Sequence, residues 1–174
     1  ELRAELTARG HVLRTRSDTE TIVHLYEEYG PRCVEHLNGM FAFAIWDPRA
    51  GSLFLARDRM GIKPLYFSQQ GRFFRFASNT QALLAGGGVD THIDPIALHY
   101  QLTLHAVVPA PRTILKGVQK LAPGTSLSLD AAGDPVQRRY WHRLGQSADD
   151  RGQIGHAPRR PCCGNPASHG KRGP

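Results

Sequence analysis

Three cysteines and nine histidines are the residues of this sequence from which a thiol nucleophile and its base could be assembled. Cys33 is a candidate nucleophile, because a histidine lying beside it could take up its proton. However, Tyr29 and Leu37 lie four residues on either side of Cys33, which is the spacing of one helix face. A free cysteine on an apolar face behaves as a small hydrophobic residue, and nothing there lowers its pKa. We therefore expect Cys33 to be a core residue and predict no catalytic residue in this sequence.

A metal site is the second chemistry that the cysteines suggest. Cys162 and Cys163 are adjacent, and His156 and His169 lie near them in the sequence. Adjacent cysteines lack the two-residue spacer that lets both sulfur atoms reach one tetrahedral ion. The sequence therefore predicts no metal site.

Asp18 is the residue that could bind a cationic ligand. It follows Ser17, which is typical of a helix N-cap, and Glu20 stands at the position that completes a capping box. An acid in the first turn of a helix is held ionised by the helix dipole and can form an ion pair. The residues alone leave two interpretations open: Asp18 receives a cationic group, or it only complements the dipole.

The elements that position these residues alternate between helical and extended patterns. The expected helices are the remainder of one at 1–9, one opened by Ser17, one after Gly30 and Pro31, and shorter ones at 80–84 and 94–102. The expected strands are 40–46, buried on both faces, its hairpin partner 52–57, and then 64–68, 72–77 and 125–129. Short turns between consecutive strands favour antiparallel pairing.

The segment 53–67, LFLARDRMGIKPLYF, joins two of these strands through a charged turn. We expect Arg57 and Asp58 to form an ion pair that pins the turn. Gly61 supplies a backbone position free of Cβ constraints, and the Lys-Pro pair that follows stiffens the return to the second strand.

This segment and the run 37–44, LNGMFAFA, resemble the glutamine amidotransferase domain of glutamine-hydrolysing asparagine synthetases. Segments 109–114 and 120–124 resemble the family's late loop and strand, so the resemblance covers about 1–141. It implies an α+β fold, part of the four-layer αββα sandwich of N-terminal-nucleophile hydrolases, with two antiparallel sheets between helices. We expect a partial type 2 glutamine amidotransferase domain at 1–142.

The resemblance also implies a chemistry. The family hydrolyses glutamine with an N-terminal cysteine, whose thiol attacks the side-chain amide while its own amine acts as the base and an Asn-Gly pair forms the oxyanion hole. This sequence begins at Glu1, and Asn38-Gly39 is a different, later pair, so we expect a fragment that lacks the nucleophile and is inactive alone. Asp18 matches the family's Ser/Thr-Asp-x-Glu segment, whose aspartate receives the ammonium group of bound glutamine.

The parent protein of this family passes ammonia from glutamine to an ATP-activated carboxylate, making asparagine or a related amide. Its synthetase domain, which uses ATP and Mg, needs a phosphate loop that this sequence lacks, and the glycines at 86–88 are better explained as a helix stop. We therefore expect no cofactor in this chain and a homodimeric parent. The alternative is a non-catalytic scaffold module that keeps the sandwich fold, and the coding DNA on either side of the sequence would separate the two.

Composition limits the partners and the location. The chain of 174 residues has a net charge of +7, of which +4 falls after residue 142, so we predict no nucleic-acid partner. No apolar run reaches about 18 residues, so no membrane span is expected. The odd number of cysteines favours a reduced, cytoplasmic protein. We expect 143–174, rich in Gly, Pro, Arg and His, to be a disordered tail.

Overall fold

The structure is a computed structural model in which residues 1–130 and 133–142 are described. Residues 1–142 form one compact unit. The expected disordered tail and the Cys162-Cys163 pair lie outside the described residues.

Four helical segments come first: α1 (Leu2–Ala8), α2 (Asp18–Tyr29), the 3-10 helix η1 (Gly30–Arg32) and α3 (Cys33–His36). Ser17 is the N-cap of α2, as predicted, and its side chain accepts a hydrogen bond from the Thr19 amide at 3.2 Å. The predicted capping box is wrong, because the Glu20 carboxylate accepts hydrogen bonds from the backbone of Arg14 and Thr15 instead. Glu20 therefore fixes the segment that leads into α2.

The first sheet has four antiparallel strands in the order β1-β2-β6-β7: β1 (Ala42–Asp47), β2 (Ser52–Arg57), β6 (Thr125–Leu129) and β7 (Pro135–Arg139). The prediction that the first strand is buried on both faces is wrong. In this sheet β1 is an edge strand, and Ala44 and Trp46 are exposed while Phe43 and Ile45 pack against the helices. Strand β7 was not predicted, because its five residues are all exposed and show no apolar alternation.

The second sheet has three antiparallel strands in the order β4-β3-β5: β3 (Tyr66–Gln70), β4 (Phe73–Ala77) and β5 (Gln119–Lys120). Between β4 and β5 the chain forms the helices α4 (Thr80–Ala85) and α5 (Pro95–Thr103), whose N-cap side chains are those of Asn79 and Asp94. Gly86 is the C-cap of α4, which agrees with a helix stop. No helix in the described part of the chain is long and apolar enough to cross a membrane.

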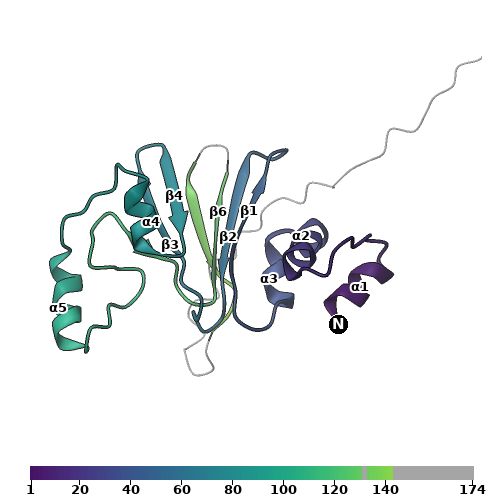
Figure 1. The fold of residues 1–174 in the computed structure, drawn as a ribbon, viewed down its shortest axis with the longest axis horizontal. Helices are drawn as coiled ribbons and strands as arrows, with labels where there is room; N and C mark the ends of the chain where they lie inside the picture. Colours follow the sequence, from purple (N-terminus) through teal and green to yellow (C-terminus); the bar gives the residue numbers. More distant parts are fainter. Residues whose placement is uncertain (131–132, 143–174) are drawn as a thin grey trace, which may run out of the picture. The chain divides into compact units, whose positions relative to one another are not determined.

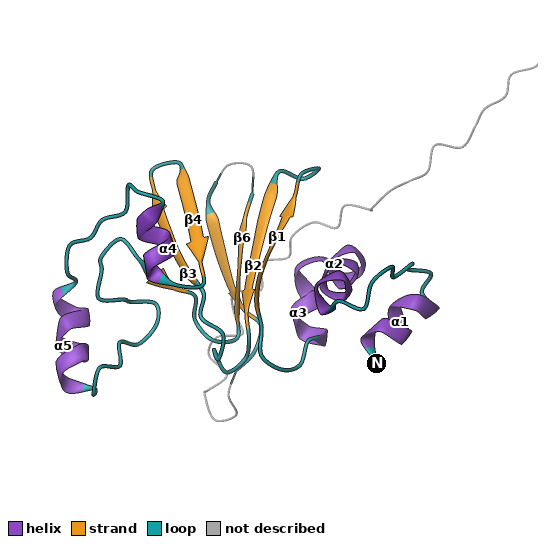
Figure 2. Ribbon diagram, viewed as in Figure 1, coloured by secondary structure: helices purple, strands orange, loops and turns teal. Residues whose placement is uncertain are grey.

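Two apolar clusters hold these layers together. The first packs Leu6, Leu25, Cys33 and Val34 from the helices against Phe54 and Ala56 of β2. The second lies between the two sheets and contains Leu55, Leu65, Phe67, Leu121, Leu127 and Leu129. Since Leu55 points away from Phe54 and Ala56, β2 contributes to both clusters, as strand alternation requires. Helices α1, α2 and α3 lie on one side of the strands and α4 and α5 on the other (Figures 1 and 2), which confirms the expected order of helix, sheet, sheet and helix.

Candidate functional site

A groove of about 370 Å³ runs beside the first turn of α2. We call it the Asp18 groove; it is lined by Asp18, Thr19, Ile22, Val23, residues 40–45, Lys63, Pro64 and Ser78. Strand β1 forms one wall and the N-terminal half of α2 forms the other, so elements distant in sequence meet here. The structure thus places the predicted binding residue, Asp18, in a groove.

The Asp18 carboxylate has one oxygen in use and one available. Its Oδ1 accepts a hydrogen bond from the Thr19 amide at 2.9 Å, and Asp18 itself is exposed. Within the described part of the chain Asp18 forms no ion pair, and its Oδ2 accepts no hydrogen bond. Because the positive end of the α2 dipole lies beneath it, the carboxylate is suited to accept hydrogen bonds from a cationic ligand.

The segment that leads into α2 is held by the Glu20 carboxylate. Its Oε1 accepts from the Arg14 amide at 2.7 Å, and its Oε2 accepts from the amide and the hydroxyl of Thr15, both at 2.8 Å. These bonds, with the one from Arg14 first, lower the pKa of Glu20 to about 2. Glu20 therefore stays ionised across the physiological range and keeps the chain before Asp18 in one path.

The charged turn after β2 borders the same groove through Lys63 and Pro64. The predicted ion pair between Arg57 and Asp58 is wrong, since within the described residues neither side chain bonds the other. Arg57 instead donates to three backbone carbonyls, those of Lys63 at 2.8 Å, Gly61 at 2.7 Å and Leu121 at 2.6 Å. The expectation that these residues pin the turn is confirmed, but through the backbone.

Asp58 lies inside the turn and binds its backbone. It is 1% exposed, and its carboxylate accepts hydrogen bonds from the amides of Met60 at 3.1 Å, Ile62 at 2.9 Å and Lys63 at 2.9 Å. Burial raises the pKa of Asp58, but the hydrogen bonds from the backbone outweigh it, so the pKa lies below its ordinary value. A buried carboxylate anchored in this way makes the turn rigid.

Gly61 meets two demands in this turn. Its φ is +67°, in the left-handed region, and a Cβ there would lie 2.7 Å from Cγ of Pro123. Only glycine satisfies both at low cost.

Cys33 is a core residue, as predicted. It is 0% exposed and packs in the cluster beneath α2, and burial raises the pKa of its thiol to about 12. A thiol that stays protonated at neutral pH and lies away from solvent cannot serve as a nucleophile. The core placement is confirmed, and the absence of a catalytic role for Cys33 stays a prediction.

We expect Cys33 to resist modification in the folded chain. With Cys162 and Cys163 replaced by serine, Ellman's reagent at pH 8 should leave the native protein unlabelled and should react with one thiol once urea unfolds it. Rapid labelling under native conditions would show that Cys33 is accessible and ionisable, contrary to its burial.

The groove also contains two residues to which no ligand role was assigned from the sequence. Lys63 and Ser78 lie at the groove, and both follow strand or turn segments with no ligand motif. Their placement depends on the pairing of β3 with β4 and on the Asp58 turn, which are long-range features. A cluster of His11, His24 and Glu27 was missed as well, and it is described below.

Comparison with known proteins agrees with this architecture. Residues 1–141 match the family described as "Glutamine amidotransferase domain". The chain is 39% identical over 142 residues to asparagine synthetase [glutamine-hydrolyzing] 3 of Bacillus subtilis, covering 82% of the chain and 23% of that protein. It is 40% identical over 146 residues to a putative asparagine synthetase [glutamine-hydrolyzing] of Mycobacterium tuberculosis, covering 81% and 22%. The chain thus spans about a quarter of the length of these curated relatives.

A solved structure shows the same fold. The glutamine phosphoribosylpyrophosphate amidotransferase of B. subtilis superposes with a TM-score of 0.53 at 21% identity, over 82% of this chain and 26% of that one. At this level of identity the likeness concerns the fold, which is of the N-terminal-nucleophile hydrolase type.

Proposed function

The chain belongs to the glutamine amidotransferase domain family, and we propose on that premise that it forms the glutamine-binding part of an asparagine synthetase-like protein. In this proposal the Asp18 groove binds L-glutamine, and the ammonia released from its side-chain amide is passed to an ATP-activated carboxylate. The observation that carries the proposal is the position of Asp18: an exposed carboxylate with a free oxygen, at the start of a helix and in a groove.

The groove offers complementary surfaces to an amino acid of this size. The Asp18 carboxylate would accept hydrogen bonds from the α-ammonium group, as in the family that the sequence resembles. The methylene groups would lie along the apolar wall formed by residues 40–45, which include Phe41 just before β1 and Phe43 within it. Such a division, one charged anchor and one apolar wall, fixes the orientation in which the side-chain amide is presented.

Hydrolysis requires a nucleophile that the described residues do not supply. Cys33 is the cysteine in the described part of the chain, and its thiol is buried. We propose that the reacting thiol is the family's N-terminal cysteine. Its sulfur would attack the amide carbon, its amine would carry the thiol proton to the departing ammonia, and water would then release glutamate from the thioester.

Use of the ammonia belongs to the remaining part of the parent protein. The relatives are about four times as long as the matched region, which leaves room for a domain that activates a carboxylate with ATP and Mg. We propose aspartate as the acceptor because the matched relatives are named asparagine synthetases.

The proposal is tested by following the amide nitrogen. The complete protein that contains this domain, supplied with ATP, Mg, aspartate and glutamine labelled with ¹⁵N in the side-chain amide, should produce asparagine carrying the label. Unlabelled ammonium added in excess should dilute the label only in part, since ammonia released inside the protein is used before it mixes. Glutamine that is neither bound nor hydrolysed would overturn the proposal and favour a scaffold module.

A further inference from the structure

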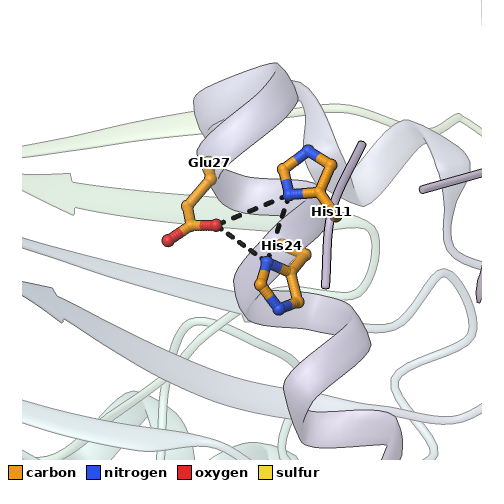
Figure 3. Close-up of side chains that lie close together, drawn as sticks. All are labelled: His11, His24 and Glu27. Carbon is orange, nitrogen blue, oxygen red and sulfur yellow. Dashed lines mark hydrogen bonds and ion pairs between the residues drawn. The ribbon is translucent and has the colours of Figure 1, made fainter. Parts of the chain in front are cut away.

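Three metal-ligating side chains converge on one face of α2, outside the Asp18 groove (Figure 3). His24 and Glu27 lie three residues apart on the helix, so they share a face. His11 reaches them from the segment between α1 and α2. The two histidine side chains are mostly buried, at 17% and 19% exposed, while Glu27 is 57% exposed, so the cluster opens to solvent on one side.

The ligand atoms have the separation that a single ion requires. Nδ1 of His11 lies 3.2 Å from Nδ1 of His24, and Oε2 of Glu27 lies 2.8 Å from the His24 nitrogen and 3.8 Å from the His11 nitrogen. Three corners of a tetrahedron with metal bonds of about 2.0–2.2 Å are about 3.3–3.6 Å apart. The observed distances lie on both sides of this value, so shifts of a few tenths of an ångström would complete the geometry.

An outer carboxylate orients the first histidine. Nε2 of His11 lies 3.3 Å from Oε2 of Glu28, whose other oxygen accepts a hydrogen bond from Arg9 at 2.8 Å. A neutral imidazole that donates its Nε2–H to a carboxylate must carry a lone pair on Nδ1. That lone pair points at His24 and Glu27, and this arrangement of carboxylate, histidine and inward lone pair is the one that supports metal-bound histidines.

The cluster has more acceptors than protons in the absence of a metal. With His11 neutral and in that tautomer, its Nδ1 and Oε2 of Glu27 can only accept, and the single donor between them would be the Nδ1–H of His24. A divalent cation would satisfy all three atoms at once if His24 moved its proton to Nε2. The charges also balance: Arg9 is paired with Glu5 as well as with Glu28, so the carboxylates of Glu5, Glu27 and Glu28 and this one guanidinium leave a net charge of −2 to face the +2 of the ion.

We propose that His11, His24 and Glu27 form a binding site for a divalent transition-metal ion such as Zn²⁺, with the fourth position open to solvent. Imidazole ligands favour zinc and its neighbours over magnesium and calcium, which prefer oxygen. None of the three ligands lines the Asp18 groove, so the site does not depend on the proposed glutamine function. Bound metal would tie the segment that leads into Ser17 to the body of α2.

Titration of the whole chain with Zn²⁺ tests this site. Cys162 and Cys163 are first replaced by serine, because free thiols also bind zinc. Calorimetry should show one site per chain. Glu28→Gln, which removes the outer carboxylate, should weaken the affinity for Zn²⁺ roughly 10- to 100-fold. His24→Asn and Glu27→Gln, which each remove a ligand, should weaken it by more. His99→Asn, an exposed histidine on α5, is the matched control and should leave binding unchanged.

Thermal unfolding distinguishes a variant that has lost the metal site from one that folds poorly. Zn²⁺ should raise the Tm of the chain with an intact site and of His99→Asn. It should not change the Tm of His24→Asn, because only a site that binds the ion links binding to stability. A dissociation constant above about 1 mM, or affinity that is the same in His24→Asn and His99→Asn, would overturn the proposal.

Discussion

Replacing Asp18 with asparagine in the complete protein should weaken glutamine-dependent amide formation by roughly tenfold to a hundredfold and leave ammonia-dependent synthesis nearly unchanged. The carboxylate would meet the α-ammonium of glutamine in a charge-assisted hydrogen bond, worth about 1.5–3 kcal/mol. Asparagine keeps the oxygen that accepts from the Thr19 amide, so the helix start survives while the charge is lost. Ammonia added from solution bypasses the groove. Steady-state kinetics with each nitrogen source provides the comparison.

A second ligand separates recognition from folding. Glutaramate has the amide and carboxylate of glutamine but no α-ammonium, so it should bind the unmodified protein and Asp18→Asn about equally well. Asp134→Asn, an exposed aspartate before β7, is the matched control and should change neither activity. If Asp18→Asn lowers the two activities to the same extent, Asp18 acts on the start of α2 and the ligand role is wrong.

Much of the fold could be predicted from local signals. Ser17, Asn79 and Asp94 each precede a helix and cap it, and the turn at 48–51 joins β1 to β2 as a hairpin. These features depend on a few neighbouring residues, which the sequence displays directly. Strands β5 and β7 could not be predicted, because two or five mostly polar residues become strands only when a partner strand supplies their hydrogen bonds.

The candidate site, like the fold, could be predicted from the sequence only in part. Asp18 could be selected because a helix start gives an acid a physical role, and the resemblance to a family assigned it a ligand. Lys63 and Ser78 reach the same groove through strand pairing that no local pattern encodes. The His24 and Glu27 pair was visible as an i, i+3 spacing, but His11 joins it from thirteen residues away and from outside the helix.

The turn after β2 shows why residue types can be identified while their partners are not. Arg57 and Asp58 are adjacent and opposite in charge, so an ion pair is the simplest prediction. Adjacent residues at the end of a strand point to opposite faces, however, and each side chain finds backbone groups on its own side. The turn thereby satisfies buried amides and carbonyls that a mutual ion pair would leave without partners.

Replacing Asp58 with asparagine should therefore lower the free energy of unfolding by about 2–4 kcal/mol at neutral pH. The amide oxygen of asparagine can still accept from Met60 and Ile62, but its NH₂ group would face the Lys63 amide, donor against donor. The charge assistance of all three bonds is lost as well. Urea unfolding of the chain gives the measurement, and Asp134→Asn, exposed and directly before β7, should stay within about 0.5 kcal/mol of the unsubstituted chain.

The same variant predicts a pH dependence whose sign follows from the pKa of Asp58. The folded-state pKa lies below the ordinary value of 3.8, so the carboxylate stabilises the folded chain above that pH and the contribution is lost as pH falls through the folded-state pKa. Protonated Asp58 would present one oxygen and one O–H, much like asparagine. The difference in the free energy of unfolding between the unsubstituted chain and Asp58→Asn should therefore decrease below about pH 4. A difference that stays constant from pH 7 to pH 3 would mean that the stabilisation comes from the shape of the Asp58 side chain and not from its charge.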